Sequence, residues 1–192
     1  MKRVFLIGDS IRLGYDSILR DDLADVAQIY WNQDNARFVQ YTLRNISPWS
    51  QNDCDPQKID IVYWNNGLWD VAHMKDGASL NTVETYAETL KRIIFVLHQI
   101  FPNAQIIFAL TTCVLEERVN PAIPRNNADI CRYNQAACLV MSEAGIAVHD
   151  LYTVSKSVPD DHRTEDGVHF TPEGYQTLGR TIAGYLRPIL AQ

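Results

Sequence analysis

The chain has 192 residues, of which 46% are hydrophobic and 21% are charged, a composition typical of a globular protein. Its formal net charge of −6 at pH 7 argues against nucleic acid or an anionic membrane as the main partner, because both require basic patches. We expect one domain over residues 1–192, which is long enough to bury a core without disulfides or a structural metal.

The cysteines and the apolar segments indicate a cytoplasmic protein. The four cysteines, at positions 54, 113, 131 and 138, have neither CxxC pairing nor the spacing of a zinc site, which suits a reducing compartment. The apolar run at residues 4–7 is too short for a secretion signal. The longest apolar tract, residues 93–110, is interrupted by polar residues and a proline and cannot span a bilayer.

Short apolar runs recur along the whole chain. They lack the alternation of polar and apolar residues that marks a half-exposed strand, so we predict strands covered on both faces, as in a parallel sheet. The predicted strands are residues 4–7, 26–31, 59–64, 106–110 and 146–149.

Amphipathic segments separate these strands. One begins at Asn81, which we expect to cap a helix together with Glu84. Another covers residues 127–143, and the last begins with Thr171 as its cap and Pro172 as its first residue. Strands that alternate with helices predict a doubly wound α/β sandwich, in which ligands bind at the carboxyl ends of the strands.

The first of those ends carries Gly-Asp-Ser at residues 8–10. Gly8 permits a tight turn, and Ser10 would lie near a helix N-terminus, where negative charge is stabilised. Considered alone, Ser10 is better explained as a helix cap, a role that serine often has. The motif therefore does not identify a nucleophile by itself.

A second motif, Asp166-Gly-Val-His169, lies just before the last predicted helix. A serine hydroxyl needs a base to take its proton, and an imidazole needs a carboxylate to fix its tautomer. An Asp three residues before a His supplies that carboxylate if the turn brings the side chains together. The alternatives are a solvated surface loop and a metal site, for which no second cluster offers ligands.

Together the two motifs resemble the SGNH/GDSL hydrolase superfamily, and the resemblance extends over essentially the whole chain. The Phe-Thr-Pro-Glu-Gly that follows His169 is also typical of it. The resemblance implies a three-layer α/β/α sandwich with a five-stranded parallel, flavodoxin-like sheet. It also implies that Ser10 is the nucleophile, His169 the general base and Asp166 its orienting partner, with no metal or organic cofactor.

The two middle motifs of the family, which supply oxyanion donors, fit less well. Ala36 stands where the second motif has a glycine, whose backbone N–H is the donor. A strict alignment of the third motif, Gly-x-Asn-Asp, puts Trp69 at its Asn, whereas a shifted alignment lets Asn66 or Asn65 donate. We predict an oxyanion hole formed by the N–H groups of Ser10 and Ala36 and the side chain of Asn66.

Other residues near the strand ends are candidates for substrate contact. They are Asp9, Asn65, Trp69 and Arg37. Trp69 can stack on a sugar ring or belong to the core, and Arg37, like Arg12, is better explained as a surface residue than as a substrate contact. Within the loop at residues 110–127, which borders the site in this architecture, Glu116, Arg118, Asn126 and Asn127 are possible specificity determinants. His73 is expected to be incidental.

Family members of this compact size look like esterases for small acyl groups, often acetyl groups on carbohydrates. The expected function is therefore hydrolysis of small acyl esters, acetyl esters above all, on a small molecule or carbohydrate. Two alternatives stay open: a lysophospholipase or thioesterase for longer acyl chains, and a non-catalytic binding module on the same fold. We expect no nucleic-acid or membrane partner, and the sequence does not determine the oligomeric state.

Overall fold

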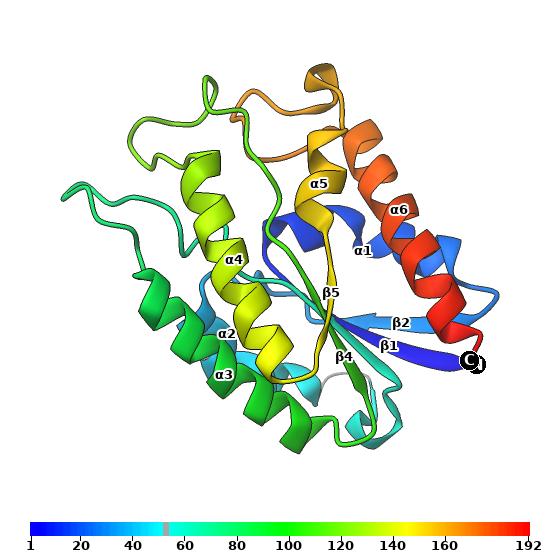
Figure 1. Ribbon diagram of the computed structural model, residues 1–192. Coiled ribbons are helices and arrows are strands. Elements are labelled where there is room, and N and C mark those ends of the chain that lie inside the picture. The colour runs from blue at the N-terminus through cyan, green and yellow to red at the C-terminus, as the bar shows by residue number, and fades with distance from the viewer. Residues whose placement is uncertain (52–53) are drawn as a thin grey trace.

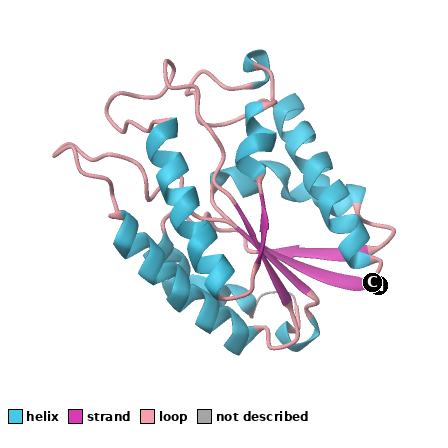
Figure 2. Ribbon diagram, in the orientation of Figure 1, coloured by secondary structure: helices cyan, strands magenta, loops and turns pink. Residues whose placement is uncertain are grey.

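The computed structural model describes residues 1–51 and 54–192 and has three layers, with a parallel sheet between two layers of helices (Figure 1, Figure 2). The sheet order is β2-β1-β3-β4-β5. All five predicted strands are present, with slightly different ends. The strands are β1 (Lys2–Ile7), β2 (Ala27–Trp31), β3 (Ile61–Trp64), β4 (Gln105–Ala109) and β5 (Ala147–His149). The predicted fold class is confirmed.

Helices cover both faces of the sheet (Figure 1). The α-helices are α1 (Ser10–Asp22), α2 (Val39–Ser50), α3 (Val83–Ile100), α4 (Asn127–Glu143), α5 (Leu151–Lys156) and α6 (Pro172–Leu190), with short 3-10 helices η1 (Pro56–Lys58) and η2 (Asp160–His162). Helices α1, α5 and α6 pack on one face, and α2, α3 and α4 pack on the other. Right-handed crossovers place α1 on one face and α2, α3 and α4 on the other, because the chain reverses its direction across the sheet after β2.

The central strands have apolar sequences because both of their faces are covered. All four residues of β3 are buried, and the Trp64 ring packs edge-on against Phe108 of β4, with centroids 4.8 Å apart. On the α1–α6 side, a Cβ at Gly14 would lie 2.2 Å from the Tyr175 ring. This glycine therefore allows the two helices to approach closely.

The helix starts agree with the sequence in two cases and differ in one. Helix α4 has the predicted bounds, and Thr171 caps α6 with Pro172 as its first residue. Helix α3 is instead capped by Thr82, whose hydroxyl accepts from the Thr85 N–H at 3.2 Å. The predicted cap at Asn81 is wrong, because the Asn81 amide donates to the Asp70 carboxylate at 2.7 Å.

The segments that follow the carboxyl ends of the strands gather at one end of the molecule (Figure 1). They are the start of α1 after β1, the loop at residues 65–82 after β3, the loop at 110–126 after β4, and residues 163–171 before α6. None of the helices in the described part of the chain combines the length and apolarity of a membrane span.

Candidate active site

Asp9 and Ser10 divide two roles at the start of α1. The carboxylate of Asp9 caps the helix by accepting from the Ile11 N–H at 3.0 Å. Ser10 is the first helical residue, and its Oγ lies 2.7 Å from Nε2 of His169. The helix-cap explanation of Ser10 is therefore wrong, because Asp9 caps the helix and the serine hydroxyl meets an imidazole.

The other ring nitrogen of His169 meets a carboxylate. Nδ1 lies 2.6 Å from Oδ2 of Asp166, while Oδ1 accepts from the N–H groups of Val168 and His169 and from the Thr164 hydroxyl. Burial raises the pKa of Asp166, but these hydrogen bonds outweigh it and hold that pKa well below its ordinary value. Because an ionised carboxylate only accepts, Nδ1 carries the proton and Nε2 is left to accept from Ser10.

A glycine turn brings Asp166 and His169 together. Gly167 has a φ of 69°, and a Cβ there would lie 2.4 Å from the Leu115 carbonyl oxygen. The Leu115 N–H in turn donates to the Gly167 carbonyl at 2.8 Å. The turn is therefore fixed against the loop that follows β4, and that close approach leaves no room for a side chain.

Sequence reasoning missed a buried arginine that supports the same turn. Arg163 is 4% exposed and donates to the carbonyls of Cys113 and Ser155. Its guanidinium carbon also lies 4.6 Å from the centroid of the Phe170 ring. Its residue type gives no signal of this, because most arginines lie at the surface and only tertiary contacts distinguish a buried one.

Ser10, Asp166 and His169 line one pocket of about 220 Å³. Its other walls come from the loops after β3 and β4 and from the turn before His169. The remaining lining residues are Leu68, Trp69, Asn120, Ile123, Arg125 and Val168. The pocket is small beside ordinary ligand sites of roughly 300–1,000 Å³. It combines apolar walls with a few polar side chains.

Two of the three predicted oxyanion donors are committed elsewhere. The Ala36 N–H donates to the Gly8 carbonyl at 3.0 Å. Asn66 is fully buried, where its amide donates to the Arg37 carbonyl at 3.0 Å and its Oδ1 accepts from the Trp64 indole. These two assignments are wrong, because neither group lines the pocket. The Ser10 N–H lies in the first turn of α1, where a helix leaves its N–H groups without an internal partner.

The left-handed backbone conformation that a glycine would favour falls at Arg37, with a φ of 50°, rather than at Ala36. The N–H of Arg37 donates to the Asn35 side chain at 2.8 Å. The conformation that a glycine favours therefore lies one residue after the predicted position at Ala36.

Of the four predicted substrate contacts, Trp69 alone lines the pocket. Asp9 and Asn65 are buried, at 0% and 4% exposure, and neither lines the pocket. Burial raises the pKa of Asp9. Arg37 is exposed and lies over the Tyr41 ring, with its guanidinium carbon 4.5 Å from the ring centroid. Burial contradicts the contacts predicted for Asp9 and Asn65, whereas the contact predicted for Arg37 stays a prediction.

Arg12 is neither a surface residue nor a substrate contact. It is fully buried, and it donates to the Asp16 carboxylate at 2.9 Å and to the Asp34 carbonyl at 2.7 Å. Burial lowers the pKa of Arg12, and the Asp16 charge opposes that change. Arg12 therefore joins α1 to the loop after β2.

The loop after β4 reaches the pocket with other residues than those singled out. Asn120, Ile123 and Arg125 line the pocket. The four residues named from the sequence hold the loop instead. Glu116 accepts from the Asn127 N–H, Arg118 donates to the Asp160 carbonyl, Asn126 caps α4, and the Asn127 amide donates to the Val114 carbonyl. His73 bonds to Asp129 at 2.9 Å, outside this pocket.

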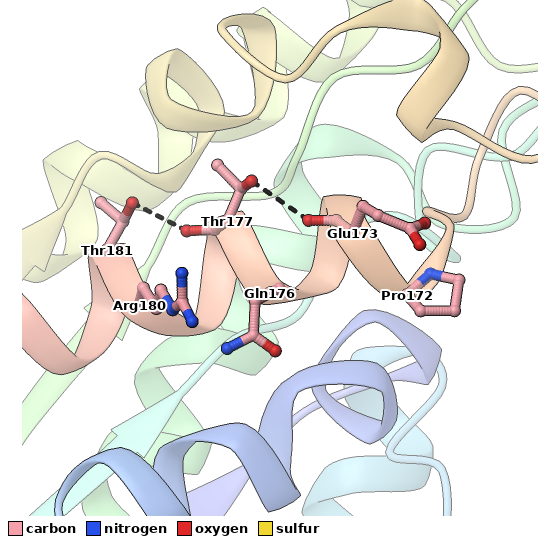
Figure 3. A pocket seen from close by; sticks show the side chains of 6 residues that line it. All are labelled: Pro172, Glu173, Gln176, Thr177, Arg180 and Thr181. Carbon is pink, nitrogen blue, oxygen red and sulfur yellow. Dashed lines mark hydrogen bonds between the residues drawn. The ribbon is translucent and has the colours of Figure 1, made fainter.

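Figure 3 shows a different pocket, on one face of α6. Its lining residues are Pro172, Glu173, Gln176, Thr177, Arg180 and Thr181. The hydroxyls of Thr177 and Thr181 donate to the carbonyls of Glu173 and Thr177, one helical turn back (Figure 3). These hydroxyls donate to backbone carbonyls and not to an imidazole, in contrast to Ser10.

Comparison with solved structures gives the same fold. A lipase/acylhydrolase from Enterococcus faecalis is similar with a TM-score of 0.76 and 23% identity, over 98% of this chain and 97% of that chain. The acetyl xylan esterase AlAXEase is similar with a TM-score of 0.74 and 16% identity, over 96% of this chain and 99% of that chain. A member of the lipolytic protein G-D-S-L family from Veillonella parvula is similar with a TM-score of 0.71 and 18% identity, over 97% of this chain and 99% of that chain.

Comparison with curated proteins gave no match. The model of the GDSL-like lipase/acylhydrolase family, in contrast, matches residues 6–177, which include both sequence motifs and the pocket they line. The resemblance inferred from the sequence is confirmed. The chain belongs to the GDSL-like lipase/acylhydrolase family and is a hydrolase of the SGNH type.

Proposed function

We propose that the protein is a serine esterase for short acyl groups, acetyl groups above all, with Ser10 as nucleophile. One observation carries the proposal: a continuous hydrogen-bond chain runs from Asp166 through His169 to Ser10, with distances of 2.6 Å and 2.7 Å. That chain ends in a pocket of about 220 Å³, with room for a short acyl chain. A binding module would need neither this chain of Asp, His and Ser nor an imidazole whose Nε2 is free to accept a proton.

The mechanism is a two-step acyl transfer. His169 Nε2 takes the Ser10 proton as Oγ attacks the ester carbonyl, and the resulting imidazolium then protonates the leaving alkoxide. Water next attacks the acyl-enzyme, again losing its proton to His169, and the acid is released with Ser10 regenerated. Throughout, Asp166 keeps the proton on Nδ1 and stabilises the imidazolium.

The oxyanion forms near the start of α1. The Ser10 N–H is its first donor, since the helix dipole and unpaired N–H groups favour negative charge there. Trp69 stands at the Asn position of the family's third motif and lines the pocket, so its indole N–H is our candidate for the side-chain donor.

The small volume of the pocket favours short acyl substrates. A space of about 220 Å³ suits a short acyl group better than the long chain of a lysophospholipase or thioesterase substrate. Trp69 offers an aromatic wall against which a sugar could stack, and one structural neighbour is an acetyl xylan esterase. We therefore propose acetyl esters, on carbohydrates among other alcohols, as the first substrates to test.

A series of p-nitrophenyl esters tests this assignment. We expect kcat/KM to be highest for the acetate and to fall as the acyl chain lengthens to butyrate and octanoate, with no turnover by Ser10→Ala. A higher kcat/KM for the octanoate would contradict the short-acyl assignment. Equal background rates for wild type and Ser10→Ala would contradict the esterase assignment itself.

A further inference from the structure

Arg125 is a cation in the wall of the Ser10 pocket. Its Nε donates to the Leu68 carbonyl at 2.6 Å, and its Nη1 to the Ile123 carbonyl at 3.4 Å. The side chain is half-buried and is held between the loops after β3 and β4. The protein therefore places this guanidinium in the wall of the pocket that holds Ser10 and fixes it there by backbone contacts.

The charge of Arg125 has no carboxylate partner among the residues that the structure describes. Arg12 pairs with Asp16 and Arg187 with Asp25, whereas both contacts of Arg125 are neutral carbonyls. The carboxylate in the same pocket is that of Asp166, and its two oxygens already accept four hydrogen bonds.

The guanidinium also keeps donors for a ligand. It carries five N–H groups, of which the two contacts use two, and it stays protonated at neutral pH. Its planar fork binds a carboxylate through two parallel hydrogen bonds. Burial lowers the pKa of Arg125, and the charges of Asp9 and Asp166 oppose that change. A positive group with no carboxylate partner in the described part of the chain, in the pocket that holds the nucleophile, is suited to an anionic substrate.

We propose that Arg125 binds a negatively charged group of the substrate, most simply a carboxylate close to the ester. The protein would then be an esterase for short acyl esters of acidic compounds, an inference that rests on the proposed function. The net charge of −6 repels anions in general, so this preference comes from one local cation.

Four esters, in two pairs of one anionic and one neutral ester, test the proposal. Phenyl acetate is neutral, 3-acetoxybenzoate carries its carboxylate on the alcohol side, and the mono-p-nitrophenyl ester of glutaric acid carries it on the acyl side, with p-nitrophenyl butyrate as its neutral counterpart. The measured quantity is the ratio of kcat/KM for an anionic ester to that for its neutral counterpart. This ratio is independent of the fraction of folded enzyme, so a poorly folding variant still gives an answer.

We expect Arg125→Gln to lower this ratio about 10- to 100-fold for at least one anionic ester, the loss typical of a charge-assisted hydrogen bond. Arg125→Lys should recover part of the ratio because it retains the charge. The matched control is Arg118→Gln, which removes another guanidinium from the same loop. The Arg118 side chain does not line the pocket, and its Nη1 donates to the Asp160 carbonyl. That control should leave the ratio unchanged within about twofold.

The outcomes separate the two proposals. Equal losses on neutral and anionic esters in Arg125→Gln would overturn the inference, because they would mean that Arg125 shapes the pocket or stabilises the oxyanion. Unchanged kcat/KM values for all four esters in Arg125→Gln would overturn it as well. If wild type hydrolyses none of the esters faster than Ser10→Ala, the proposed function itself fails. A selective loss for 3-acetoxybenzoate places the anion on the alcohol, and one for the glutarate ester places it on the acyl group.

Discussion

At the scale of single residues, the site depends on a division of work between neighbours. Asp9 caps α1, which leaves the Ser10 hydroxyl to His169. Asp166 binds the backbone of its own turn with one oxygen and the imidazole with the other. The geometry therefore makes the second oxygen of Asp166 the group that sets the tautomer of His169.

Replacing Asp166 by Asn tests that role. An Asn side chain keeps one accepting oxygen for the turn but presents an N–H to Nδ1, which then loses its proton to Nε2. The base facing Ser10 would be lost, and we expect kcat for the acetate ester to fall about 10⁴-fold with little change in KM, as for the equivalent change in serine proteases.

The control for this change is Glu165→Gln, at the exposed residue next to Asp166. It removes the same charge from the same turn and should leave kcat within about twofold. If Asp166→Asn cost less than about tenfold, another group would have to orient His169, and the assigned role of Asp166 would be wrong.

At the scale of elements, the carboxylate of Asp70, far along the chain, caps the N-terminus of α2. The N-cap residue Phe38 makes no side-chain hydrogen bond, and the Val39 N–H instead donates to Asp70 Oδ1 at 3.1 Å. The Asn81 amide donates to the same oxygen at 2.7 Å. Asp70 therefore ties α2 to the loop after β3, one of whose residues is Trp69 in the pocket wall.

Burial raises the pKa of Asp70 to about 7. In the unfolded chain an Asp titrates near pH ~3.9, so between about pH 4 and 7 the folded protein holds a proton that the unfolded chain releases. The stability that Asp70 contributes is complete below about pH 4 and is lost as the pH rises towards 7. Asp70→Asn keeps the accepting oxygen and removes this titration.

We therefore expect the free energy of unfolding of Asp70→Asn, relative to wild type, to rise by on the order of 3–4 kcal/mol between about pH 4 and pH 8. Urea unfolding at the two pH values measures it. Asp76→Asn, at an exposed turn residue whose carboxylate accepts from the Ala78 N–H, is the control and should show little such change. A pH-independent difference for Asp70→Asn would refute the assigned titration.

At the scale of the whole molecule, the fold could be predicted from the sequence because buried parallel strands appear as short, continuous apolar runs. The apolar runs of β1 and β3 and their alternation with helices predict the layers. The helix cap at Asn81 was wrong by one residue, because Asn81 and Thr82 are both good caps and the tertiary bond to Asp70 decides between them.

The site could be predicted from the sequence only where the residue type determines the chemistry. Ser10, Asp166 and His169 follow from their motifs. The residue type does not determine which acceptor a backbone N–H binds, so the hydrogen bond from the Ala36 N–H to the Gly8 carbonyl was missed. Arg125 was missed because the path of the loop after β4 depends on contacts far along the chain, such as Arg163 with Cys113. The single domain, the cytoplasmic location and the lack of a cofactor stay predictions.

The central claim is that Ser10 is the nucleophile, and labelling with a fluorophosphonate probe tests it most directly. The account predicts one adduct on intact wild-type protein, located by peptide mass spectrometry at Ser10, and none on Ser10→Ala. Folded wild type that takes up no probe, or equal labelling of wild type and Ser10→Ala, would contradict it.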